Sequence, residues 1–132
     1  MQTILIVDDS GTARMFIKRC LEISGCMGAQ FKEAADGNQA LLILEQGPVD
    51  FIVADLNMPV LDGRCMLKQI KANPKTSAIP VVVITSASNY AANVELMSEG
   101  AYAVLSKPIT PPTLISSLGA LLKKQGVDNG AA

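Results

Sequence analysis

Five short strand-like runs, most of them rich in Ile, Val and Ala, alternate along the chain with five amphipathic segments, and this alternation limits the fold more than any other feature. Runs of this length predict buried strands, and the segments between them predict helices. The expected strands span residues 3–7, 29–34, 49–55, 80–85 and 101–106. The expected helices span residues 12–24, 37–46, 63–73, 89–99 and 111–124. Strict alternation implies right-handed crossovers, so we expect an α/β fold with a doubly wound, five-stranded parallel sheet and helices on both faces.

The length of the chain predicts one compact domain. A chain of 132 residues buries about two-thirds of the surface of its unfolded form, which is enough for a single core. Turn-forming pairs such as Asp36-Gly37 and Asp62-Gly63 separate the expected elements. The last residues have no apolar periodicity. We therefore expect a domain at residues 1–124 and a flexible tail at residues 125–132.

Composition excludes several kinds of site and partner. The formal net charge is −1, so the chain lacks the basic field that nucleic-acid binding requires. Cys20, Cys26 and Cys65 have no CxxC spacing and the chain has no histidine, which argues against a zinc site and favours reduced packing residues. No signal-peptide pattern is present, and no apolar stretch approaches the roughly 18 residues of a membrane span. We expect a cytoplasmic protein that binds neither nucleic acid nor membrane.

Two of the expected strands end at carboxylates. Asp8 and Asp9 follow the first apolar run, and Asp55 ends the third. Because ligands of an open parallel sheet lie beyond the carboxyl ends of its strands, we expect the three side chains to meet at one edge. Carboxylates that close repel each other unless a cation lies among them. Oxygen ligands with room for water favour a hard cation, so the sequence predicts a Mg²⁺ site, in which Mn²⁺ could substitute.

Three more polar residues reach the same edge from the last two strands. Thr85 and Ser86 end the fourth strand, and Lys107 follows the fifth. Acids, hydroxyls and an ammonium group together predict a site that handles phosphate with a metal. Taken singly, each feature has a simpler interpretation, because an acidic pair is more often a helix cap or a solvated turn and a lone lysine is usually on the surface.

Four segments have the order and spacing of the signature segments of a known family: VDDSGTAR, VADLNMPVLDG, VVVITSAS and GAYAVLSKP. Through them the chain resembles the response-regulator receiver domain, the CheY-like family of two-component signalling. The similarity extends from Thr3 to Leu122. Each segment alone is a weak signal, but four in register are specific. The resemblance implies a flavodoxin-like sheet with strand order 2-1-3-4-5.

The resemblance implies a role for each acidic residue. Asp55 corresponds to the phosphoacceptor, which also contacts the metal. Asp9 resembles the direct Mg²⁺ ligand, and Asp8 the partner that reaches the metal largely through water. Asn57 corresponds to the residue whose backbone carbonyl completes the protein ligands.

The resemblance also assigns the groups that would bind the phosphoryl oxygens. Thr85 matches the switch hydroxyl, with Ser86 beside it, and Lys107 matches the family lysine that pairs with the phosphoacceptor or a phosphoryl oxygen. Lys107-Pro108 matches a peptide bond that is cis in the family, an isomer that a following proline permits. Asn57 and Ala87 occupy the positions that influence hydrolysis of the acyl phosphate.

Two positions depart from the family pattern. The family commonly has Tyr or Phe where this chain has Val104, and the nearest aromatic residue is Tyr102. Alternate residues of a strand share a face, so Tyr102 could substitute in part for the missing ring. The other departure is Ala87, where many relatives have a longer polar side chain.

The family implies a single-domain response regulator that accepts a phosphoryl group from a histidine kinase or a histidine phosphotransfer protein. It would catalyse only its own phosphorylation and dephosphorylation, and would bind a target through the fourth-helix, fifth-strand and fifth-helix face. The basic residues Arg14, Lys18 and Arg19 are either a solvated helix face or part of a kinase-docking surface. The sequence leaves open whether the pathway is a chemotaxis switch or a phosphorelay shuttle. It also leaves open the cognate kinase, the phosphoryl lifetime and the oligomeric state.

Two alternative functions are weighed against this one. The first is a degenerate receiver that acts as a scaffold without phosphorylation, which Val104 leaves open. The second is a small Mg²⁺-dependent phosphatase that works through an aspartyl phosphate. Such enzymes usually have an aspartate as general acid two residues after the nucleophile, where this chain has Asn57.

Overall fold

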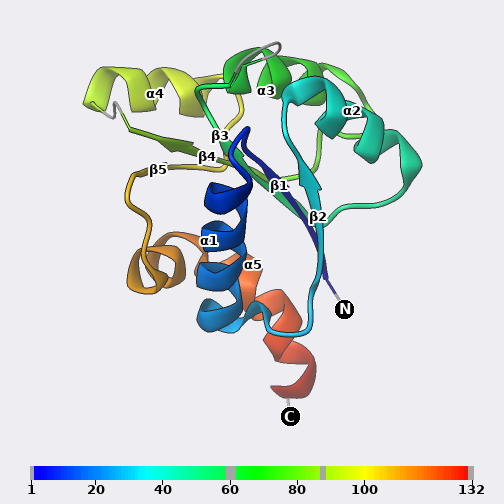
Figure 1. Ribbon diagram of the computed structural model, residues 1–132, viewed down its shortest axis with the longest axis vertical. Helices are drawn as coiled ribbons and strands as arrows, with labels where there is room; N and C mark the ends of the chain where they lie inside the picture. The colour runs from blue at the N-terminus through cyan, green and yellow to red at the C-terminus, as the bar shows by residue number, and fades with distance from the viewer. Residues whose placement is uncertain (1, 59–61, 87–88, 131–132) are drawn as a thin grey trace.

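The computed structural model describes the backbone of residues 2–58, 62–86 and 89–130, and the side chains in these ranges up to residue 122 (Figure 1). Five strands form one sheet: β1 (Thr3–Val7), β2 (Gln30–Ala34), β3 (Phe51–Asp55), β4 (Val81–Thr85) and β5 (Ala103–Ser106). All neighbouring strands pair in parallel, and their order is β2-β1-β3-β4-β5. The predicted doubly wound sheet and its strand order are confirmed.

The helical elements are α1 (Gly11–Leu21), η1 (Glu22–Cys26), α2 (Gly37–Gln46), α3 (Gly63–Ala72), α4 (Tyr90–Ser98) and α5 (Pro111–Gly130). The prediction of one regular helix over residues 12–24 was wrong at its end. The chain widens there into the π-helical turn η1, in which Gly25 has a positive φ of 126° that glycine adopts readily. Helix α5 bends at Leu118 and continues beyond the expected end at residue 124. The flexibility of residues 125–132 stays a prediction.

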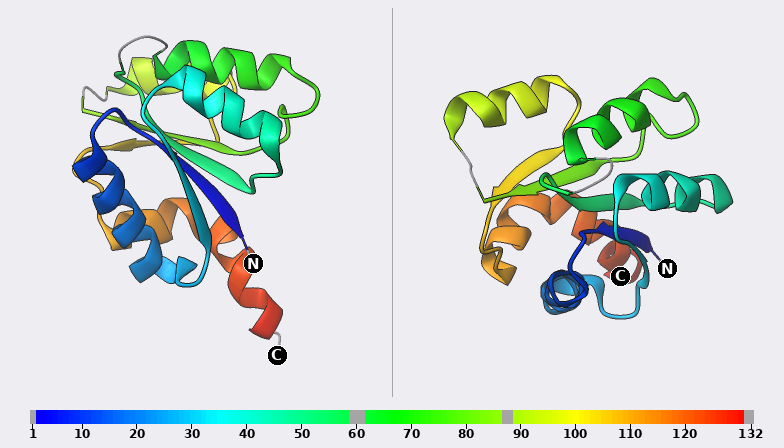
Figure 2. Two further views of the ribbon diagram at one scale, coloured as in Figure 1. Left: turned by 45° about the vertical axis from the view of Figure 1, so that its right-hand side comes forward. Right: turned by 45° about the horizontal axis from the view of Figure 1, so that its top comes forward.

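Helices cover both faces of the sheet (Figure 2). Ile4 and Ile6 of β1 belong to the hydrophobic cluster beneath α1 and α5, whereas Leu5 and Val7 belong to the cluster beneath α2, α3 and α4. Every residue of β3 and β4 is buried. Burial on both faces explains why the apolar runs are continuous rather than alternating with polar residues.

Polar side chains begin four of the helices at the edge where the strands end. Ser10, Asp36, Asp62 and Asn89 precede α1 to α4 in turn, and each side chain accepts a hydrogen bond from the amide three residues later. These caps set where each loop ends and each helix begins.

Two further features bear on the expectations from composition. All three cysteines are free thiols, and Cys20 and Cys26 are buried in the core as expected of packing residues, but Cys65 on α3 is exposed. In the described part of the chain, no helix combines the length and the apolar character needed to span a bilayer.

Candidate functional site

The three predicted acidic residues lie together beyond the carboxyl ends of β1 and β3. The two strands are neighbours, with Val7 paired to Ala54, so the residues that follow them are also adjacent. Each of Asp8, Asp9 and Asp55 has a carboxylate oxygen within 4.8 Å of one from each of the others. Asp8 and Asp55 are buried and Asp9 is exposed. Asp9 is therefore the carboxylate of the three that is most accessible to solvent.

The negative charge of Asp8 lies in an unfavourable environment. Its Oδ1 atom accepts a hydrogen bond from the Ser10 amide at 2.9 Å, but its buried Oδ2 atom has no hydrogen-bond partner among the residues that the structure describes. Burial raises the pKa of Asp8, the Ser10 hydrogen bond opposes this rise, and the negative charge of Asp55 adds to it. A buried carboxylate oxygen without a partner is costly, and a cation would relieve that cost.

Asp55 is bounded by a cation and an amide. The Lys107 ammonium nitrogen lies 3.4 Å from Asp55 Oδ2, and the Asn57 amide donates to Asp55 Oδ1 at 3.3 Å. Lys107 follows β5, and its own amide donates to the carbonyl oxygen of Thr85. The Lys107-Pro108 peptide bond is cis, the isomer that the resemblance implies. Lys107 thus reaches across the end of β4 to the end of β3.

The expected hydroxyls lie at the end of β4. Thr85 is buried and ends a strand that pairs with β3 on one side and β5 on the other. Its neighbour Ser86 is exposed. Ala87, the expected influence on hydrolysis, lies outside the described residues. Four strands thus bring their polar residues to one edge, as the alternation of the sequence predicted.

The chemistry of these donors fits a hard divalent cation. All three acidic side chains offer oxygen, and Asp8 Oδ2 has no hydrogen-bond partner in residues 2–58, 62–86 and 89–122. Asp9 is exposed to solvent, which leaves room for water ligands. The acidic cluster could therefore bind a metal ion.

Comparison with known proteins identifies the family. The sequence profile of the response regulator receiver domain matches residues 4–119. The chain belongs to this family. It is 36% identical over 121 residues to the chemotaxis protein CheY-3 of Vibrio cholerae, with 92% of each chain covered.

Solved structures of receivers resemble the domain along nearly its whole length. The chemotaxis response regulator CheY4 of Vibrio cholerae has a TM-score of 0.80 at 30% identity, covering 92% of this chain and 98% of CheY4. The receiver domain of the Francisella response regulator 1452 has a TM-score of 0.80 at 28% identity, covering 95% and 99%. The match to CheY-like receivers supports a role in phosphoryl-accepting signalling with histidine kinases and downstream targets.

The residues at and before β5 are those at which the sequence departs from the family pattern, Val104 and Tyr102. Val104 is partly buried and packs against the cluster beneath α2, α3 and α4, whereas Ala103 packs against the opposite cluster. Tyr102 lies in a bend just before the strand, is 37% exposed, and its amide donates to the carbonyl oxygen of Val81. Tyr102 therefore lies one step outside the strand on which it was expected to share a face with Val104.

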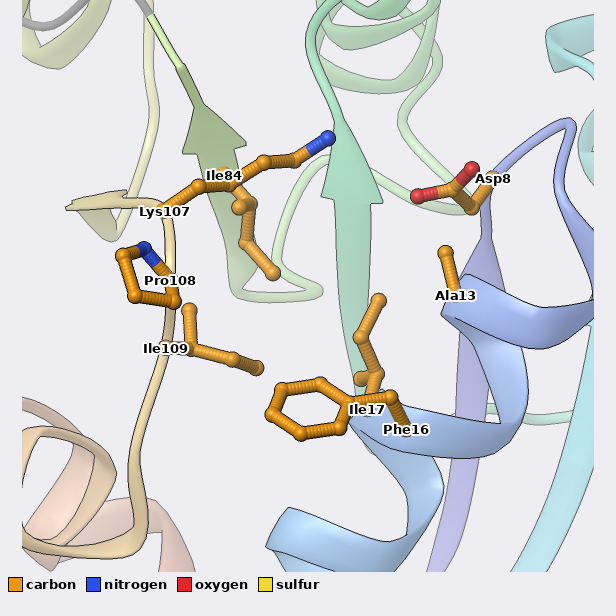
Figure 3. A pocket seen from close by; sticks show the side chains of 8 residues that line it. All are labelled: Asp8, Ala13, Phe16, Ile17, Ile84, Lys107, Pro108 and Ile109. Atoms are coloured by element: carbon orange, nitrogen blue, oxygen red, sulfur yellow. The ribbon is translucent and has the colours of Figure 1, made fainter.

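The receiver domain also has an apolar pocket beside the acidic cluster that the sequence did not reveal (Figure 3). Its volume is about 420 Å³. It lies between α1 and the loop after β5, and its lining residues are Asp8, Ala13, Phe16, Ile17, Ile84, Lys107, Pro108 and Ile109. Phe16 is half exposed at its mouth. The signal in the sequence was an apolar group on α1 at helical spacing, which is indistinguishable from a core face until the loop after β5 is placed opposite it.

Proposed function

We propose that the protein is a response regulator whose Asp55 accepts a phosphoryl group from a phosphohistidine. The observation that carries this proposal is the position of Asp55, a buried carboxylate with the Lys107 ammonium on one side and Asp8 and Asp9 on the other. A nucleophile between a cation and a group of metal-ligating oxygens is what phosphoryl transfer requires, because catalysis there depends on positioning and on charge stabilisation.

In the proposed transfer an Asp55 carboxylate oxygen attacks the phosphorus atom. A bond forms between that oxygen and phosphorus as the bond from phosphorus to the donor imidazole nitrogen breaks, and the imidazole leaves with the bonding electrons and takes up a proton. The Lys107 ammonium stabilises negative charge on the transferring oxygens, and the Thr85 and Ser86 hydroxyls offer hydrogen bonds at the same edge.

Asp9, Asp55 and the Asn57 carbonyl would hold Mg²⁺ directly, and Asp8 would do so largely through water. Mg²⁺ bound there would supply positive charge that offsets the acidic cluster and the charge of the phosphoryl group. Mn²⁺ has the same ligand preference and is the expected substitute. In the family that the chain belongs to, the positions of Asn57 and Ala87 influence attack by water on the acyl phosphate, so we propose that these two residues set the rate of dephosphorylation.

A target protein would bind the face formed by α4, β5 and α5, and its affinity would depend on phosphorylation. This face has exposed apolar side chains from all three elements or their ends: Tyr90, Val94 and Met97 on α4, Tyr102 before β5, and Ile115 on α5. Charge added at Asp55 shifts the balance between two arrangements of this face. The net charge of −1 supports a protein target rather than a nucleic acid.

The second candidate is a receiver that acts as a scaffold without phosphorylation. Val104 favours it, because a small aliphatic side chain there cannot act as the aromatic switch of the family. The acids and Lys107 favour the first candidate, since a scaffold has no need of them. Asn57 disfavours a phosphatase that needs an acid at that position.

Intact mass spectrometry distinguishes these candidates. Wild type, Asp55→Asn and Glu45→Gln, a control that removes an exposed carboxylate from α2, are each incubated with acetyl phosphate, with and without Mg²⁺. We expect wild type and the control to gain the mass of one phosphoryl group only with Mg²⁺, and Asp55→Asn to gain none. No gain by wild type, under conditions that label a known receiver, would refute the proposal and favour the scaffold.

A further inference from the structure

Arg14 on α1 reaches back over the start of its own helix to the loop that carries the acids. Its Nη1 atom donates to the carbonyl oxygen of Asp8 at 2.6 Å, and its Nε atom donates to Glu33 Oε1 at 2.8 Å. The Arg14 side chain is only 19% exposed. A guanidinium engaged in this way is not available as a docking group, so the structure favours a different role for Arg14 from the two considered in the sequence.

Glu33 connects this contact to the sheet. It lies near the end of β2 and is paired in register with Ile6 of β1, two residues before Asp8. Arg14 therefore links three parts of the fold: α1, the loop after β1, and β2. The planar guanidinium suits this link, because its donors have fixed directions and can serve two acceptors at once.

The contact leaves Asp8 with one unengaged oxygen. The Asp8 amide donates to the Ala34 carbonyl oxygen, its carbonyl oxygen accepts from Arg14, and its Oδ1 accepts from the Ser10 amide. Within the described part of the chain, Asp8 Oδ2 has no hydrogen-bond partner, and Asp8 is a member of the acidic cluster. The backbone of Asp8 is thus held on both sides, and Arg14 supplies one of the two backbone contacts.

The charge of Arg14 does not explain its place. A cation in the first turn of a helix opposes the helix dipole, and a cation beside a metal site would weaken binding of Mg²⁺. Glu33 offsets the charge of Arg14 through their ion pair. The remaining explanation for the position of Arg14 is the geometry of its two short, charge-assisted hydrogen bonds.

We propose that Arg14 is a positioning residue of the metal site, which holds the Asp8–Asp9 loop in the conformation that binds a divalent cation. This inference rests on the proposed function, because it assumes that the acidic cluster binds Mg²⁺. Groups that orient metal ligands from outside typically change metal affinity by about 10-fold to 100-fold when they are lost.

The test is a titration of each protein with Mg²⁺, followed by the NMR amide shifts of residues near the cluster. For Arg14→Gln we expect a dissociation constant at least about 10-fold higher than that of wild type. Arg19→Gln is the matched control, because it removes the same charge from the same helix at an exposed position, and we expect its dissociation constant to match that of wild type. An Arg14→Gln protein that binds Mg²⁺ as tightly as wild type, or more tightly, overturns the inference.

Arg14→Lys separates geometry from charge and covers the case in which Arg14→Gln does not fold. A lysine keeps the charge but cannot donate to Asp8 and Glu33 from the two positions of the guanidinium. Positioning therefore predicts weaker Mg²⁺ binding by Arg14→Lys, and binding equal to wild type overturns the inference. If wild type itself binds no Mg²⁺, the proposed function fails, which is a different outcome from equal binding by the variants.

Discussion

Gly63, the first residue of α3, lies against the backbone of Asp55 so closely that a Cβ atom on Gly63 would come within 2.6 Å of the Asp55 carbonyl oxygen. The same atom would come within 2.8 Å of the Leu56 Cα atom, and the Gly63 amide donates to the Leu56 carbonyl oxygen at 2.9 Å. Neither backbone group can move without moving the end of β3. The start of α3 and the backbone of Asp55 are thus one rigid unit.

Gly63→Ala should therefore destabilise the domain. Overpacking of this kind costs about 1–3 kcal/mol, and we expect a loss of that size in the free energy of unfolding, measured with urea in the absence of Mg²⁺. Gly119→Ala in α5 is the control, because nothing lies within 4 Å of its added Cβ atom. A helical alanine there should stabilise the protein by up to about 1 kcal/mol. Equal stability of Gly63→Ala and wild type would contradict the rigid unit.

Asp8→Asn should stabilise the metal-free protein at neutral pH. Burial, together with the charge of Asp55, raises the pKa of Asp8 above its usual 3.8, so the folded state binds this proton more tightly than the unfolded state. Wild type accordingly loses stability as the pH rises from about the usual value through the raised pKa of the folded state. The asparagine variant has no such loss, so we expect it to be more stable than wild type at pH 7.

Thermal unfolding at several pH values checks this prediction. The difference between Asp8→Asn and wild type should shrink as the pH falls below the usual pKa, because both side chains are then neutral. Mg²⁺ should stabilise wild type more than the variant, since a ligand that binds the folded state more tightly raises the free energy of unfolding more. A variant less stable than wild type at pH 7 without metal would show that Asp8 is not strained.

Arg64 should control the stability of α4 locally. Its Nη1 atom lies 3.2 Å from Glu95 Oε1 and 3.5 Å from Glu99 Oε2, so it joins α3 to α4 and its end. Leu96 is the one buried residue of α4, which is described in full. Partly exposed ion pairs contribute up to about 1 kcal/mol, so Arg64→Ala should accelerate amide exchange in α4 by up to about fivefold.

Arg19→Ala is the matched control, because it removes a partly exposed ion pair between Arg19 of α1 and Glu22 of η1, away from α4. Hydrogen exchange followed by mass spectrometry should show no change in α4 for this control. Faster exchange spread over the whole domain in Arg64→Ala, rather than confined to α4, would mean that the ion pairs support the global fold instead of this helix.

Cys65 should be the one thiol that reacts with iodoacetamide in the folded protein at pH 8. Cys65 is exposed, whereas Cys20 and Cys26 are buried, and burial raises the pKa of Cys26 to about 11. Because the thiolate is the reactive form, Cys26 is protected by both access and ionisation. Intact mass should show one added group for wild type and none for Cys65→Ser. Two or more added groups without denaturant would indicate that the core opens.

The alternation of apolar runs and amphipathic segments determined the fold and much of the site. Ile and Val in continuous runs indicate strands buried on both faces, and a sheet of such strands brings the residues after them to one edge. For this reason Asp8, Asp55, Thr85 and Lys107 could be placed together from their positions alone. The boundaries were less certain, and the widening of the chain after Leu21 was not visible in a pattern of helical period.

Only the tertiary structure decided which partners the individual side chains have. From the sequence, Arg14 could not be distinguished from the other basic residues of an exposed helix face. In the structure its guanidinium donates hydrogen bonds to Glu33 of β2 and to the Asp8 carbonyl oxygen in the loop after β1. The pocket beside the cluster needed the loop after β5 opposite α1, and the exposure of Cys65 depends on which face of α3 meets the sheet. Periodicity is a local property of the chain, so it encodes the elements and their buried faces. Contacts between elements depend on the angles and distances at which the elements pack, and no local pattern specifies these.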